Sequence, residues 1–142
     1  MIKKCNFIEK LRETGLRPTK QRIKICEILF SREKTFHFTI NDLVKTISND
    51  LSEKIALATV YNTVHAFKNK GYLKEISINS DKNYFDTNTS AHHHFYDEDT
   101  QELIDCDEND VDSININKNI TGKKINSIEV LIRVASDNHN QN

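Results

Sequence analysis

The sequence predicts an α+β fold made of two small domains, and three observations support this. Apolar residues recur at helical spacing up to about residue 70, and shorter runs typical of strands follow. The two halves of the chain carry opposite charge. A length of 142 residues suits one ordinary domain or two small ones, and 37% hydrophobic residues can build a core.

Four helices are predicted in the N-terminal half, each from its apolar spacing and its end signals. A short helix covers residues 7–13, and a second begins at Thr19. The third begins at Thr39, whose side chain can cap it, and the fourth ends at Gly71. The apolar faces of the last three helices are Ile25, Ile28 and Leu29; Ile40, Leu43, Val44 and Ile47; and Leu57, Val60, Val64 and Phe67.

A short hairpin follows these helices. Residues 73–78 and 83–87 are typical of strands, and residues 79–82 of the turn between them. Helices followed by a small hairpin are the layout of a winged helix-turn-helix, whose second motif helix lies in a DNA major groove. In the remaining part of the chain, residues 125–135 are predicted to form the main core strand.

The charge distribution favours a polyanion as partner of the first half. Residues 1–87 hold 16 Lys and Arg against 10 Asp and Glu, a balance of +6, whereas residues 88–142 hold 4 against 11, a balance of −7. Charge pairing between the halves is the alternative. The fourth helix adds a polar stripe suited to base edges and phosphates, although a solvated face would look similar. This stripe consists of Thr59, Asn62, Thr63, His65 and Lys68.

Several classes of protein are disfavoured. No apolar run reaches the roughly 20 residues of a membrane span, and the N-terminus has no continuous hydrophobic stretch, so we expect a cytoplasmic protein without membrane contact. The three cysteines contain no C-x-x-C and are scattered. They therefore indicate neither a disulfide framework nor a thiolate zinc site.

The stretch SAHHHFYDEDTQELIDC is the strongest candidate for a metal site. In an extended segment the side chains of His92 and His94 point one way and that of His93 the other. Two imidazoles on one side form an H-x-H pair that suits Zn, Fe, Mn or Co, with carboxylates as further ligands. The acidic run at residues 97–110 is interpreted as mostly a solvated turn, with Asp105 as the exception.

The segments LRPTKQR, LATVYNT, YFDTN and HHHF resemble, in this order and spacing, the ferric uptake regulator family of bacterial repressors. The resemblance covers residues 11–134 and is strongest to the iron response regulator (Irr) branch. It implies a winged-helix DNA-binding domain at residues 1–87, a hinge near residues 87–92, and a small α/β dimerisation and sensing domain at residues 88–142. It also implies homodimers on AT-rich palindromic operators.

The resemblance assigns roles in DNA binding. Arg17 matches a basic residue that enters the minor groove, and Tyr61 a recognition-helix residue that contacts bases. Asn62 stands where the family usually has Arg, and the Irr branch also has Asn there. The predicted DNA-binding residues are Arg17, Lys20, Thr59, Tyr61, Asn62 and Lys68.

The resemblance also supplies metal ligands from both domains. His37, Asp86 and Asp105 match ligand positions and would join His92 and His94 in a three-histidine, two-carboxylate site. Such a site couples metal occupancy to the angle between the domains. His37 alone could instead cap the following helix. A second metal site of the family is in doubt because Ala91 replaces a ligand, and the four-cysteine structural zinc is absent because Asp97 and Thr100 occupy its first C-x-x-C.

The Irr branch implies haem as the signal, with His92, His93 and His94 as candidate haem-binding residues and a haem-synthesis enzyme as a possible partner. The Cys-Pro haem motif of some members is missing. The predicted function is an iron-responsive repressor controlling haem-synthesis and iron-homeostasis genes. The alternative is a direct sensor of Fe, Mn, Zn or peroxide.

Two other classes were weighed against a regulator. A metalloenzyme is disfavoured because the chain contains no H-E-x-x-H and no Gly-rich phosphate loop. A metal or haem storage protein would leave the basic half unexplained. We therefore expect a regulator that is not an enzyme.

Overall fold

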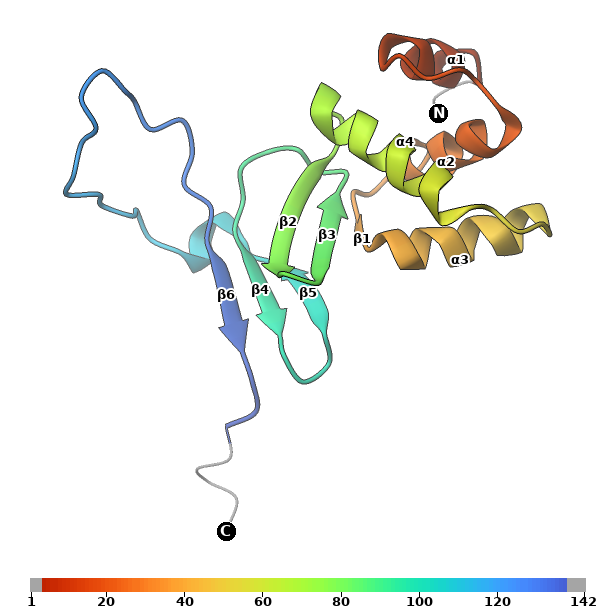
Figure 1. Cartoon of the computed structure of the whole chain (residues 1–142). Coiled ribbons are helices and arrows are strands. Elements are labelled where there is room, and N and C mark those ends of the chain that lie inside the picture. Colours follow the sequence, from red (N-terminus) through yellow and green to blue (C-terminus); the bar gives the residue numbers. More distant parts are fainter. Residues whose placement is uncertain (1–3, 138–142) are drawn as a thin grey trace. The chain divides into compact units, whose positions relative to one another are not determined.

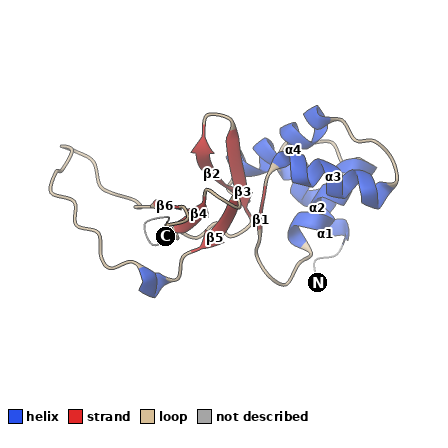
Figure 2. Ribbon diagram, turned by 90° about the horizontal axis from the view of Figure 1, so that it is seen from below, coloured by secondary structure: helices blue, strands red, loops and turns tan. Residues whose placement is uncertain are grey.

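The computed structural model describes residues 4–137, which divide into two compact units between Thr89 and Ser90. Helices followed by short wing strands form the first unit, and a β-sheet forms the second, so the predicted α+β fold is confirmed. Figure 2 shows the helices in blue and the strands in red. Among the described residues, no helix combines the length and apolar character needed to cross a membrane.

All four predicted helices are present (Figure 1): α1 at Lys4–Glu13, α2 at Lys20–Phe30, α3 at Ile40–Leu51 and α4 at Leu57–Lys70. Two of them begin at threonine caps. The Thr19 hydroxyl accepts a hydrogen bond from the Arg22 amide, and the Thr39 hydroxyl accepts one from the Asp42 amide, each at 3.2 Å. Helix α4 ends at Gly71, whose φ of 87° suits a residue without a Cβ.

The wing is an antiparallel pair of strands, β2 at Lys74–Asn79 and β3 at Lys82–Asp86. A third strand, β1 at His37–Phe38, pairs with β3 on its other side, so the sheet order is β1-β3-β2. Strand β1 was not predicted, because two residues carry no measurable periodicity. Its consequence is that the final residue of β3, Asp86, lies opposite His37 on one side and Lys74 on the other.

The core of the first unit fixes helix α4 by its apolar face. Val60, Val64 and Phe67 are fully buried, and the Phe67 ring meets the Phe30 ring edge-on at 5.4 Å. Burying a side chain as large as Phe67 contributes about 1.5–3 kcal/mol. Another face of α4, which carries Tyr61 and Asn62, is thereby held toward solvent.

The second unit is a three-stranded sheet of order β5-β4-β6. Strands β4, at His94–Asp97, and β5, at Glu102–Asp105, form an antiparallel hairpin, and β6, at Leu131–Val134, runs parallel to β4. A short 3-10 helix spans Glu108–Asp110. Figure 1 shows the long connection between this helix and β6, in which no regular element occurs.

One sequence-based expectation for this unit was incomplete and another was wrong. Most of the acidic run at residues 97–110 lies outside strands, as expected, but residues 102–105 form strand β5. The predicted core strand at residues 125–135 is limited to residues 131–134, and none of these four is fully buried. The physical reason is that β6 pairs in register with β4, which is only four residues long.

Candidate metal centre and DNA-binding surface

Three predicted ligands meet in the C-terminal unit. The Nε2 atoms of His92 and His94 lie 3.4 and 3.2 Å from the same oxygen, Oδ1 of Asp105. The two imidazole rings are 4.2 Å apart. The hairpin explains this convergence, because His94 at the start of β4 is paired directly with Asp105 at the end of β5. His94 is almost fully buried, whereas half of the Asp105 side chain is exposed, so the cluster can be reached from solvent.

A hydrogen bond to the backbone orients the His92 ring. His92 Nδ1 lies 2.8 Å from the carbonyl oxygen of Ser90, and because a carbonyl only accepts, Nδ1 must donate its proton. In the neutral ring, Nε2 then presents a lone pair toward the Asp105 carboxylate. Both atoms can serve as ligands of a cation.

The chemistry of these donors fits a divalent metal ion. The ligand atoms of His92, His94 and Asp105 all lie within 4.8 Å of one another. Ligand atoms about 2.1 Å from one ion stand roughly 3.0–3.5 Å apart at tetrahedral or neighbouring octahedral positions, which matches the two nitrogen–oxygen distances. The Ser90 carbonyl is an outer partner of the kind that fixes a ligand imidazole for metal binding.

His93 has a different role from its two neighbours, as the predicted alternation requires. Its Nδ1 accepts a hydrogen bond of 2.9 Å from the amide of Val130, just before β6, and its carbonyl accepts one from the amide of Cys106. His93 therefore connects, by hydrogen bonds, the residue before β6 and the residue after β5. Of the three candidate haem-binding residues, His92 and His94 point their Nε2 atoms at the Asp105 carboxylate.

The other two predicted metal ligands are neighbours within the N-terminal unit. His37 and Asp86 are directly paired across β1 and β3, and the His37 ring lies edge-on to Tyr84 at 6.1 Å. Asp86 is 1% exposed and accepts a hydrogen bond from the Asn88 amide. Burial lowers the pKa of Lys74, although the nearby Asp86 carboxylate acts in the opposite direction. Sequence reasoning missed Lys74 as a neighbour of this carboxylate.

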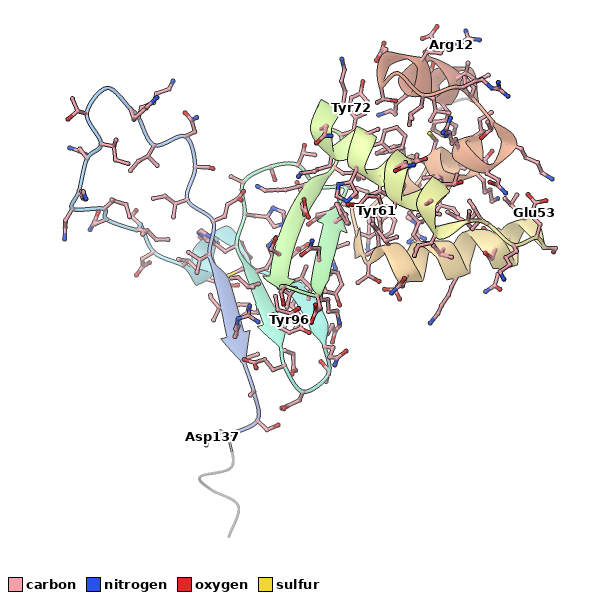
Figure 3. The ribbon with its side chains drawn as sticks, in the orientation of Figure 1. Arg12, Glu53, Tyr61, Tyr72, Tyr96 and Asp137 are labelled. Carbon is pink, nitrogen blue, oxygen red and sulfur yellow. The ribbon has the colours of Figure 1, made fainter. Side chains whose placement is uncertain are left out.

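Most of the predicted DNA-binding residues are exposed. Arg17, Lys20, Tyr61 and Asn62 face solvent, and Figure 3 shows Tyr61 on α4. The backbone at Arg17 is held by the Arg22 guanidinium, which donates to its carbonyl at 2.9 Å. This contact orders the segment before α2.

Thr59 and Lys68 are placed differently from the other members of this set. Thr59 is half-buried, and its carbonyl accepts a hydrogen bond of 2.7 Å from the Thr63 hydroxyl. Lys68 forms a 2.8 Å ion pair with Glu75 on the wing, and Asn83 donates to the same carboxylate. The charge of Lys68 is therefore partly neutralised by the protein, a pairing that the sequence did not reveal.

Cys26 and Cys106 are buried, and neither forms a disulfide. Burial raises the pKa of the Cys26 thiol to about 12, and burial followed by the acidic neighbours, Asp110 foremost, raises that of Cys106. Cys26 belongs to the first unit and Cys106 to the second. A thiol with a raised pKa is poorly available as a metal ligand at neutral pH, because the ligand form is the thiolate.

The ferric uptake regulator family matches residues 13–133 of this chain. The chain belongs to this family. Regulators of this family bind divalent metals and operator DNA, act as dimers and are not enzymes. The imidazole–carboxylate cluster and the winged helix agree with that class.

Individual relatives refine the comparison. The chain is 34% identical over 98 residues to the peroxide-responsive repressor PerR of Staphylococcus aureus, a match that covers 69% of this chain and 64% of that relative. The fold is similar to the ferric uptake regulator of Pseudomonas aeruginosa, solved with manganese, at a TM-score of 0.64, 22% identity and coverage of 92% and 97%. It is also similar to the Vibrio cholerae regulator at a TM-score of 0.67, 22% identity and coverage of 91% and 98%. The chain thus spans slightly less than two thirds of the curated relatives' length.

Proposed function

We propose that this chain is a metal-dependent transcriptional repressor that binds AT-rich palindromic operator DNA as a homodimer. The proposal rests above all on the convergence of the His92 and His94 Nε2 atoms on Asp105, in a chain whose first unit is a basic winged helix. A divalent ion is attracted by imidazole lone pairs and by a carboxylate, so it would bind where these three side chains converge.

The proposed complete ligand set is His37, Asp86, His92, His94 and Asp105. Its support is that His37 and Asp86 are already paired across the first sheet, while the other three converge in the second unit. If one ion recruits ligands from both units, its binding restricts the angle between them. The spacing of the two winged helices in a dimer then depends on bound metal. Because a palindrome requires one particular spacing, the affinity for operator DNA depends on metal as well.

The signal we propose is the metal itself, or peroxide acting through it. A relative with 34% identity is named as peroxide-responsive, and the geometry of His92 and His94 suits one small ion. Peroxide sensing would require a ligand histidine to be oxidised while ferrous ion is bound, detectable as one added oxygen atom in a peptide. The Irr assignment, the haem signal and the haem-synthesis partner stay predictions from the resemblance alone.

The proposal is tested by titrating the protein against a fluorescent AT-rich palindromic duplex in three states: metal-free, with Mn²⁺, and with haem. Salt is held constant because phosphate contacts make affinity strongly salt-dependent. We expect tight binding only with Mn²⁺ and no effect of haem. Release of the DNA by haem would support assignment to the Irr branch. Absence of sequence-specific binding in every state would refute the proposed function as a transcriptional regulator.

A further inference from the structure

A row of three rings leads from the core of the first unit to the exposed face of α4. The Phe85 ring, on β3, is 1% exposed and stacks on Phe38 at 6.0 Å. The His65 ring stands nearly perpendicular to Phe85, at 5.5 Å and 80°. On its other side His65 lies 4.1 Å from the Tyr61 ring, at 37°. His65 is thus half-buried between a fixed ring and an exposed one.

This arrangement restricts a side chain that would otherwise be mobile. Tyr61 is 50% exposed and lies one helical turn before His65, on the same face of α4. An exposed tyrosine must lose rotamer freedom when it docks against a partner. Contact with His65, which Phe85 supports from behind, removes part of that freedom before docking.

We propose that His65 is a positioning residue that holds Tyr61 in the conformation used to contact operator bases. The inference rests on the proposed function, and it assigns to His65 a role through its flat ring and not through its nitrogen atoms. A direct hydrogen bond from the imidazole to a phosphate is the competing explanation. The two explanations make opposite predictions for a ring that has no nitrogen.

The expected change in operator affinity follows from the rotamer freedom that Tyr61 regains when the His65 ring is removed. Ordering one side chain at an interface corresponds to a roughly two- to tenfold change in affinity. We therefore expect His65→Ala to weaken operator binding by roughly two- to tenfold, and His65→Gln, which fills a similar volume without a ring, to do the same. His65→Phe should bind within about twofold of the wild type, because it keeps a ring between Tyr61 and Phe85.

The experiment uses a duplex that the full-length, Mn²⁺-loaded wild-type protein selects from a random library of AT-rich palindromes. Binding of this duplex is measured at fixed salt for the three His65 variants, for Tyr61→Ala, and for Tyr61→Ala combined with His65→Ala. The effect of His65→Ala should vanish in the Tyr61→Ala background, a coupling that a general loss of structure would not produce. Thermal unfolding of each variant confirms that it is folded.

The outcomes separate two failures. If the wild type selects no duplex, the proposed function itself fails. If it selects one, the positioning role is overturned by a Tyr61→Ala variant that binds as tightly as the wild type. It is also overturned by a His65→Phe variant as weak as His65→Ala, by a His65→Gln variant as strong as the wild type, or by additive effects in the double variant.

Discussion

Replacing Asp105 by asparagine should remove most of the stabilisation that Mn²⁺ gives to the folded protein. Asp105 Oδ1 is the atom that both His92 Nε2 and His94 Nε2 approach, at 3.4 and 3.2 Å. Asparagine keeps an oxygen at this place but removes its charge. The carboxylate attraction for the ion is then lost while the shape of the hairpin is kept.

The expected size can be worked out from binding linkage. Loss of a residue that only orients a metal ligand weakens binding about 10- to 100-fold, so loss of a ligand charge should reach at least the upper value. At a Mn²⁺ concentration of about 100 times the wild-type Kd, the ion stabilises the wild type by about 2.7 kcal/mol. A 100-fold weaker variant gains only about 0.4 kcal/mol at the same concentration.

The assay is urea unfolding with and without Mn²⁺, followed by circular dichroism because the chain contains no tryptophan. Glu102→Gln is the matched control, since it removes an exposed charge from the same strand, β5, at the end away from the imidazoles. Glu102→Gln should keep the full wild-type gain. An Asp105→Asn variant that keeps it as well would show that the ion binds elsewhere.

Three further predictions concern the first unit. Between pH 9 and 10.5, the free energy of unfolding of the wild type should fall more steeply than that of Cys26→Ala, by up to about 1.4 kcal/mol per pH unit in chemical unfolding. The pKa of the thiol is near 9 in the unfolded chain and about 12 in the folded protein. Its contribution to stability is therefore full below pH 9 and is lost progressively as the pH rises toward 12. Thr39→Ala should cost about 1 kcal/mol in urea unfolding, because the Asp42 amide loses its cap; a Thr39→Ser variant as weak as Thr39→Ala would contradict this. Glu75→Gln should tighten binding to DNA and steepen its salt dependence by freeing Lys68, as fluorescence anisotropy would show, and an unchanged slope would exclude a phosphate contact.

Local signals were sufficient for the helices and the wing. Threonine caps, helical apolar spacing and Gly71 determine where helices begin and end within a few neighbouring residues. Strand β1 could not be found because its two residues gain their structure from β3, about 50 positions away. Strand β5 was hidden because acidic residues surround Leu103, its buried residue.

The candidate site was predicted in its composition but not in its chemistry. Alternation placed His92 and His94 on one side, and the family resemblance supplied Asp105. The proton on His92 Nδ1 depends on the carbonyl of Ser90, two residues earlier, which no residue type encodes. The pairing of Lys68 with Glu75 depends in the same way on how the wing packs against α4. Such contacts arise from backbone position, so a pattern of residue types cannot specify them.

Strand β3 gives the first unit a short physical connection between a candidate ligand and the recognition helix. Asp86 and Phe85 are consecutive, so their side chains leave opposite faces of the strand. Asp86 lies opposite His37, whereas Phe85 supports the His65 ring that contacts Tyr61. Both residues are buried, and packed interiors shift as units and do not deform continuously. If the proposed ion binds Asp86, it would hold the same strand, β3, whose Phe85 ring supports His65 beneath Tyr61.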